Sequence, residues 1–137
     1  MRIMGLDLGT KTIGVAVSDP LGWTAQGVKT IQRVGLKKDI EEIKLLINEY
    51  SVEKIVLGMP KNMNGTIGEA GERSLDFAKH IKNKTGIEVI LEDERLTTAA
   101  AQRTLIEADM SRKKRKKVVD TVAATYILQT YLDRNSK

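Results

Sequence analysis

The sequence predicts an α/β fold with a mixed five-stranded sheet, in which three antiparallel strands precede two parallel strands and helices cover both faces. Short apolar segments joined by tight turns open the chain, and later apolar segments are separated by stretches with helical spacing. Strands joined by short turns pair antiparallel, whereas strands separated by a helix pair in parallel. A length of 137 residues is that of one domain, so we expect a single domain over residues 1–137.

The three antiparallel strands are expected at the beginning of the chain. Residues 2–8 and 12–18 are short and apolar, and residues 9–11 between them are typical of a tight hairpin turn. Residues 24–33 predict a weaker third strand after the turn at residues 20–22. These segments therefore predict three consecutive antiparallel strands.

The second part of the chain alternates helical and strand patterns. Apolar residues recur at three- and four-residue steps over residues 36–50, which predicts an amphipathic helix. Residues 54–59 are uniformly apolar apart from the first, as in a strand buried on both faces. The remaining predicted elements are a helix over 69–84, a strand over 87–92, a helix from Thr97 or Thr98 to about residue 108, and a terminal helix over 118–132.

Composition excludes several classes of site. With no cysteine and only one histidine, the predicted surface residue His80, the chain cannot form disulfides, thiolate zinc sites or multi-histidine metal centres. Any bound metal ion would therefore be held by oxygen ligands. No segment reaches the ~18 apolar residues that span a bilayer, and Asp7 interrupts the start where a signal peptide would continue. We expect a cytoplasmic protein without a membrane partner, with Trp23, Tyr126 and Tyr131 in its core.

The net charge of +5 is confined to the end of the chain. Residues 1–108 contain 15 basic and 15 acidic residues, whereas residues 109–137 contain 8 basic and 3 acidic ones. Six of these basic residues are consecutive: Arg112, Lys113, Lys114, Arg115, Lys116 and Lys117. Such a run favours a polyanionic partner, although a solvated connection between two helices would have the same composition.

Two aspartates stand where the predicted elements should be apolar. Asp7 lies between Leu6 and Leu8 in the first strand, and a buried carboxylate is costly unless it is paired or binds a metal ion. An aspartate that bonds the following turn would explain Asp7 equally well. Asp120 shares a helical stripe with Ala124 and is expected to face the body of the protein. An acid in the first helical turn, favoured by the helix dipole, is the alternative for Asp120.

A third acidic position is the run Glu92-Asp93-Glu94 at the end of the last strand. Ligand sites in open α/β sheets lie at the carboxyl ends of parallel strands. Alternation puts Glu92 and Glu94 on one face and Asp93 on the other, and a solvated acidic loop is the alternative. Carboxylates ~4 Å apart repel by about 4 kcal/mol, and Mg²⁺ or Mn²⁺ would offset that repulsion. If the three acidic positions converge, one or two such ions would support phosphodiester hydrolysis.

Four motifs, in order along residues 1–133, carry a resemblance to a known family. They are GLDLGTKTIGVA at residues 5–16, GMPKNMNGT at 58–66, DERLTT at 93–98 and DTVAA at 120–124. On these motifs the chain resembles the YqgF family of pre-16S rRNA nucleases, also called Holliday-junction-resolvase-like proteins. The resemblance implies a ribonuclease-H-like fold.

The same resemblance implies that Asp7, Glu94 and Asp120 are the catalytic, metal-binding acids, and it is what selects Glu94 from the acidic run. These acids would hold one or two Mg²⁺ or Mn²⁺ ions in a nuclease for the 5′-end maturation of pre-16S rRNA. The partner would be nucleic acid in a ribosomal precursor, RNA rather than DNA, and the protein a monomer or homodimer. The residues expected to bind nucleic acid are Lys11, Asn62, Asn64, Arg95 and the basic run from Arg112 to Lys117.

Other interpretations stay open. Lys11 could be a solvated turn residue, and Asn62 and Asn64 could serve only to shape turns. A structure-selective nuclease for four-way DNA junctions and a nucleic-acid-binding module without catalysis are both compatible with the sequence. Residues 7–11 also resemble the phosphate-binding hairpin of actin-like and sugar-kinase ATPases. That fold needs a second domain, which 137 residues do not provide.

Overall fold

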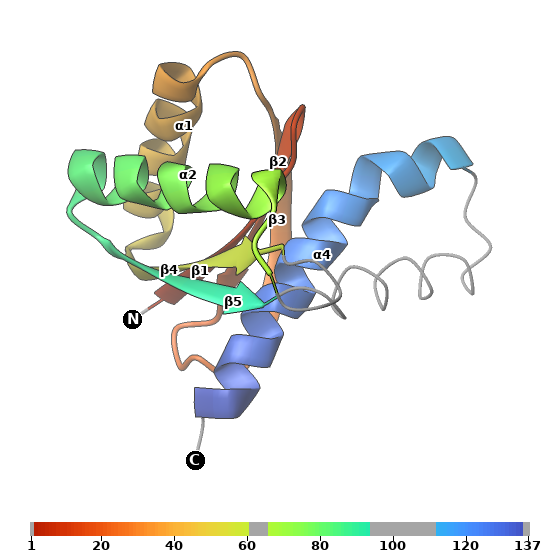
Figure 1. Cartoon of the computed structure of the whole chain (residues 1–137). Coiled ribbons are helices and arrows are strands. Elements are labelled where there is room, and N and C mark those ends of the chain that lie inside the picture. Colours follow the sequence, from red (N-terminus) through yellow and green to blue (C-terminus); the bar gives the residue numbers. More distant parts are fainter. Residues whose placement is uncertain (1, 61–65, 94–111, 136–137) are drawn as a thin grey trace.

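The computed structural model describes residues 2–60, 66–93 and 112–135, with side chains in the last range described from Thr121 onward. Its strands are β1 (Arg2–Leu8), β2 (Thr12–Ser18), β3 (Ala25–Gln32), β4 (Val52–Met59) and β5 (Glu88–Asp93). They form one sheet in the order β3-β2-β1-β4-β5 (Figure 1). Strands β1, β2 and β3 pair antiparallel, and β4 pairs in parallel with both β1 and β5. The predicted mixed sheet is confirmed.

Helices lie on both faces of this sheet, as the sequence predicts (Figure 1). Helix α1 (Leu36–Tyr50) and helix α2 (Glu69–Thr85) cover one face. Helix α4 (Arg112–Asn135) crosses the other face and packs on β1, β2 and β3. Gly86 caps the end of helix α2, and its φ of 74° is a conformation that glycine adopts without a Cβ penalty.

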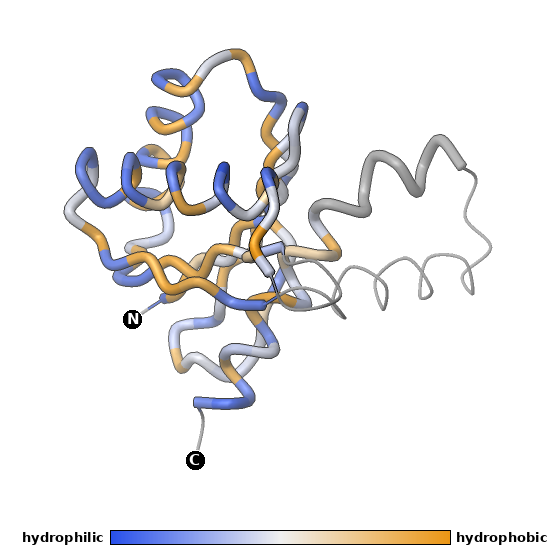
Figure 2. Tube along the Cα trace, viewed as in Figure 1, coloured by the Kyte–Doolittle hydropathy of each residue, from blue (hydrophilic) through white to orange (hydrophobic). Residues whose placement is uncertain are grey.

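Two hydrophobic clusters, one on each side of the sheet, stabilise the fold. On the α1–α2 face, alternate residues of the strands such as Met4, Leu6 and Leu57 are buried with Phe77 of α2. On the α4 face, the cluster consists of Ala16, Val56, Ala124, Ile127, Leu128, Tyr131 and Leu132. Figure 2 shows the hydrophobic segments concentrated along the central strands, while α1 and α2 alternate between hydrophobic and hydrophilic residues. This alternation is what lets each helix cover the sheet with one side.

Helix α4 approaches the sheet so closely that the strands carry glycine beneath it. A Cβ on Gly5 would lie 2.7 Å from Cβ of Leu128 and 2.9 Å from the carbonyl oxygen of Ala124. A Cβ on Gly27 would lie 2.6 Å from Cγ2 of Thr121. Glycine is therefore required at Gly5 by the packing of the helix backbone, not by a turn.

Most predicted element boundaries agree with the structure to within two residues. Helix α1 and strands β1 and β2 have the predicted bounds, and β3 is one residue shorter at each end. The predicted helix between Thr97 or Thr98 and residue 108 lies outside the described residues. Among the described residues, no helix combines the length and apolar character needed to cross a bilayer.

The predicted start of the terminal helix at residue 118 is wrong. Helix α4 begins at Arg112, so the run of basic residues 112–117 forms the first turns of the helix and does not connect two helices. Lysine and arginine are good helix formers, but a purely basic run has no apolar periodicity to reveal the helix.

The prediction that Trp23 belongs to the core is also wrong. Trp23 lies on the β2–β3 turn and is 61% exposed. Its carbonyl oxygen accepts a hydrogen bond of 3.1 Å from Nε2 of Gln129 in α4, so the turn is anchored through its backbone. Tyr131 is buried as predicted, and Tyr126 is half-buried.

Candidate active site

Asp7 is a buried carboxylate on the face of the sheet that α4 covers. Its neighbours Leu6 and Leu8 face the α1–α2 cluster, whereas Gly5 faces α4. Successive residues of a strand point to opposite faces, so Asp7 shares the α4 face with Gly5. Asp7 is 9% exposed, which agrees with the prediction that an acid interrupts the apolar strand at a protected position.

A row of residues across the sheet defines the surroundings of Asp7. Asp7 pairs with Gly14 of β2, and Gly14 pairs with Thr30 of β3. On the other side of β1, Leu6 pairs with Leu57 of β4. The next position along this parallel register places Asp7 beside Gly58, and Gly58 pairs with Glu92 of β5. Glycine therefore flanks Asp7 on both sides, and no side chain separates Asp7 from the strands beyond.

Helix α4 brings its residues near 120 to this row. The hydroxyl oxygens of Thr121 in α4 and Thr30 in β3 are 2.6 Å apart and share a hydrogen bond. Asp120 directly precedes Thr121, and it lies one helical turn before Ala124, whose carbonyl oxygen stands over Gly5 of β1. Asp120 therefore lies in the part of the helix that crosses the row of Asp7. The Asp120 side chain lies outside the described residues.

Glu92 occupies the same row and has a defined partner. It is 3% exposed, and both of its carboxylate oxygens accept hydrogen bonds from the guanidinium of Arg134, near the end of α4. A bidentate pair of this kind neutralises a buried carboxylate and fixes its geometry. Sequence reasoning included Glu92 among three candidate acids but missed Arg134, because a contact between residues so distant in the chain has no local signal.

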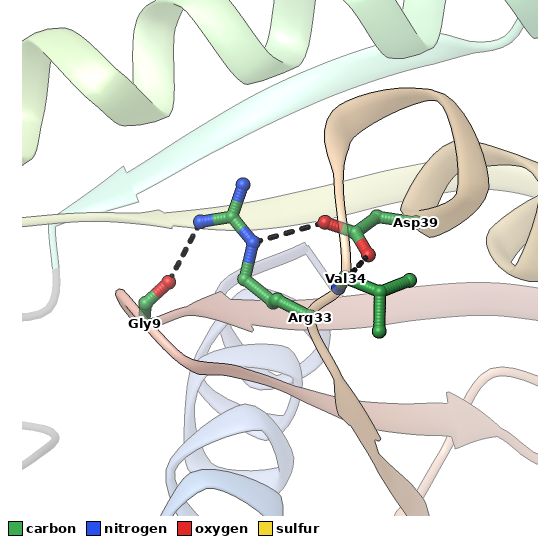
Figure 3. A network of polar contacts seen from close by, with 4 residues as sticks. All are labelled: Gly9, Arg33, Val34 and Asp39. Atoms are coloured by element: carbon green, nitrogen blue, oxygen red, sulfur yellow. Dashed lines mark hydrogen bonds and ion pairs between the residues drawn. The ribbon is translucent and has the colours of Figure 1, made fainter.

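The turn that follows Asp7 is held from the opposite side of the sheet (Figure 3). Nη1 of Arg33 donates a 2.9 Å hydrogen bond to the carbonyl oxygen of Gly9, and Nε donates a 3.1 Å bond to Oδ2 of Asp39. The other carboxylate oxygen of Asp39 accepts a 3.1 Å bond from the backbone N–H of Val34. The backbone N–H of Arg33 donates to the carbonyl oxygen of Lys11 at 2.9 Å. These residues, which we call the Arg33 clamp, were also missed by sequence reasoning.

The predicted nucleic-acid-binding residues are described only in part. Lys11 is exposed on the β1–β2 turn, two residues beyond Gly9. The basic run from Arg112 to Lys117 forms the first turns of α4, but its side chains lie outside the described residues. Glu94, Arg95, Asn62 and Asn64 also lie outside the described residues.

The donor set fits an oxygen-ligated divalent ion, although the described residues do not complete a site. Asp7 supplies a buried carboxylate, and hard cations such as Mg²⁺ and Mn²⁺ prefer carboxylate oxygens. Within residues 2–60, 66–93 and 121–135, whose side chains are described, no three acidic or histidine side chains come together to hold a metal ion. The predicted ligand set therefore depends on Glu94 and on the side chain of Asp120.

Sequence comparison places the chain among close relatives. A family model described as "RuvX: Holliday junction resolvase" matches residues 1–134. A protein of Clostridium botulinum (strain Eklund 17B / Type B) is 61% identical over 137 residues, which is all of both chains. A protein of Clostridioides difficile (strain 630) is 65% identical over 132 residues, covering 96% of this chain and 94% of the relative. Both relatives are named as proposed pre-16S rRNA nucleases.

Solved structures share the fold at low sequence identity. The Thermus thermophilus RuvC structure with a Holliday junction substrate has a TM-score of 0.62 and 11% identity, and the match covers 98% of this chain and 95% of RuvC. The fowlpox virus resolvase in complex with Holliday junction DNA has a TM-score of 0.64 and 14% identity, over the whole of both chains. These likenesses confirm the expected ribonuclease-H-like fold.

Proposed function

The chain belongs to the RuvX family, and from this premise we propose that it is a metal-dependent nuclease that hydrolyses phosphodiester bonds in a precursor of 16S rRNA. The observation that carries the proposal is Asp7, a buried carboxylate with glycine on both sides, on the face crossed by α4. A carboxylate buried within an otherwise apolar strand is costly unless it is paired or binds a metal ion, and metal binding would account for an acid at this position.

We assign the three metal-binding acids as Asp7, Glu94 and Asp120. The backbone of α4 supports Asp120, because the residue after it bonds Thr30 in the row of Asp7. Glu94 follows Glu92 by two residues, and continued alternation would give both acids the same face of the sheet. One or two Mg²⁺ or Mn²⁺ ions held there would supply the Lewis acidity that activates water and stabilises the leaving oxygen.

Basic residues would hold the substrate beside these acids. Lys11 is exposed on the turn that follows Asp7, where it can meet a backbone phosphate. The basic run of α4 leads along one helix directly into Asp120. Consecutive helical residues lie about 100° apart around the axis, so only part of the run can contact one strand of nucleic acid. We assign Arg95, Asn62 and Asn64 to the same role.

RNA is favoured over DNA because the relatives above 60% identity are named for pre-16S rRNA. A ribosomal precursor as partner implies a cytoplasmic protein. We propose that residues 1–137 act as one domain, as a monomer or a homodimer.

The test is cleavage of end-labelled structured RNA and of a four-way DNA junction, side by side, with Mn²⁺ or with EDTA. Wild type should cut the RNA only in the presence of Mn²⁺, and Asp7→Asn should abolish cleavage while the protein still folds and binds RNA. Asp76→Asn is the matched control, since it removes an exposed carboxylate on α2 that pairs only with His80 among the described contacts. Cleavage by Asp7→Asn at the wild-type rate would refute the assignment of Asp7.

A junction-selective DNA endonuclease is the second candidate, because the matching family model and both solved structures are named for Holliday junctions. Symmetrically paired cuts in the junction, without cleavage of the RNA, would favour it. Binding of both substrates without any metal-dependent cleavage would instead indicate a non-catalytic nucleic-acid-binding module.

A further inference from the structure

We propose that Arg33 is a positioning residue for the candidate site: it clamps the β1–β2 turn and thereby fixes the backbone that carries Asp7 and Lys11. This inference rests on the proposed function, because it gives Arg33 a role in the geometry of that metal site. Nothing in the local sequence around Arg33 indicates such a role.

The Arg33 clamp joins the β1–β2 turn to helix α1 (Figure 3), and Arg33 also contacts helix α2. The Arg33 guanidinium bonds the carbonyl oxygen of Gly9 in the turn and the carboxylate of Asp39 in the first turn of α1. It also lies 5.6 Å from the centre of the Phe77 ring in α2, within the range of a cation–π contact. The turn is therefore fixed against both helices of the α1–α2 layer.

The Arg33 clamp is largely protected from solvent, which strengthens its hydrogen bonds. Asp39 is 1% exposed, and the Arg33 side chain is 22% exposed. Charge-assisted hydrogen bonds between protected groups are stronger than those at an open surface. The planar fork of arginine can serve Asp39 and Gly9 at the same time, which a lysine ammonium on a flexible stem cannot do with the same geometry.

Arg33 acts on the site only through the backbone. Its side chain meets Phe77 on the α1–α2 side of the sheet, whereas Asp7 faces α4. Two backbone hydrogen bonds complete the turn, from the N–H of Gly9 to Thr12 and from the N–H of Arg33 to Lys11. Because Gly9 follows Asp7 by two residues, movement of the turn would move the Asp7 carboxylate relative to α4.

The test compares Arg33→Lys with Lys29→Gln. Arg33→Lys keeps a positive charge beside Asp39, so the protein should still fold. The planar guanidinium that bonds Asp39 and Gly9 at the same time is lost. Lys29→Gln removes an ion pair of 2.8 Å that joins β3 to α1 through Glu42. The lysine of this pair is exposed, and among the described contacts it makes no bond to the turn. The first readout is amide hydrogen exchange at Gly9. The second is binding of Mn²⁺ alone, measured by calorimetry, which does not depend on turnover.

In Arg33→Lys, the Gly9 amide should exchange at least about tenfold faster, since a held turn opens less often than a free one. Affinity for Mn²⁺ should fall about tenfold, as it does when groups that orient metal ligands are lost. Lys29→Gln should change neither quantity. Exchange or Mn²⁺ affinity that stays at the wild-type value in Arg33→Lys, in a wild type that binds Mn²⁺, would overturn the inference. A wild type that binds no Mn²⁺ and cuts nothing would instead overturn the proposed function, and the inference with it.

Discussion

Replacing Gly5 with alanine should push helix α4 away from the sheet. The added Cβ would stand 2.7 Å from Cβ of Leu128 and 2.9 Å from the carbonyl oxygen of Ala124. Carbon atoms in good contact are about 3.5–4.0 Å apart, so strand and helix must separate by roughly 1 Å. Neither clashing atom is the far end of a flexible side chain, so a rotamer change cannot relieve the contact.

The expected cost of Gly5→Ala is about 1–3 kcal/mol, the usual range for overpacking a dense interior. For a chain of this length, that corresponds to a fall in melting temperature of roughly 3–15 °C. Urea unfolding followed by circular dichroism measures the cost, and an unchanged m-value would confirm that the surface exposed on unfolding is the same. A melting temperature within about 1 °C of wild type would refute the reasoning, because it would mean that the helix moves at no cost.

A second glycine under the same helix provides the matched control. A Cβ on Gly27 would meet Cγ2 of Thr121 at 2.6 Å, so its clash is with a methyl group that Thr121→Ser removes. Serine keeps the hydroxyl that bonds Thr30. Thr121→Ser should therefore restore most of the stability lost in Gly27→Ala. Leu128→Ala should restore none of the stability lost in Gly5→Ala, because alanine retains the clashing Cβ.

Two further predictions concern single charged groups. Hydrogen bonds from the backbone N–H groups of Thr24 and Trp23 lower the pKa of Asp19 below its ordinary value of 3.8. The stabilisation is therefore fully present above that value and is lost as the pH falls through the lowered pKa. The urea midpoint of Asp19→Ala should lie below that of wild type at neutral pH, and the two should converge in acid. Arg134→Met should cost about 1.5–3 kcal/mol in urea unfolding, because it leaves the buried Glu92 carboxylate without its charged partner. The double variant with Glu92→Gln should recover part of that loss, and an Arg134→Met protein as stable as wild type would show that the pair contributes nothing.

Local patterns predicted the elements whose signal lies within a few residues. Helix α1 has its predicted bounds because apolar residues recur through its whole length, and the hairpin of β1 and β2 follows from two apolar segments around a short turn. The first turns of α4 were missed because residues 112–117 are all basic. Trp23 was predicted to be buried because aromatic rings usually are. Its turn is instead anchored to α4 through the backbone carbonyl, which leaves the side chain exposed.

The contacts that shape the candidate site could not be predicted from the sequence, for a different reason. Arg33 and Gly9 lie 24 residues apart, and Arg134 and Glu92 lie 42 residues apart. Each pair meets only because the strand order β3-β2-β1-β4-β5 brings distant segments to the same place. Sequence reasoning predicted the mixed five-stranded sheet but not the order of its strands, so it had no means of choosing which arginine would meet which partner.

The acidic run at the end of β5 illustrates how the structure narrows a choice that the pattern left open. Alternation gives Glu92 and Glu94 one face and Asp93 the other, so the pattern alone could not separate the two glutamates. The structure commits Glu92 to Arg134, with both carboxylate oxygens engaged. A carboxylate engaged in this way would have to lose its arginine before it could bind a metal ion, and that loss is costly for a group that is 3% exposed. We therefore propose Glu94 rather than Glu92 as the metal ligand, which is the choice that the family motif implies on independent grounds.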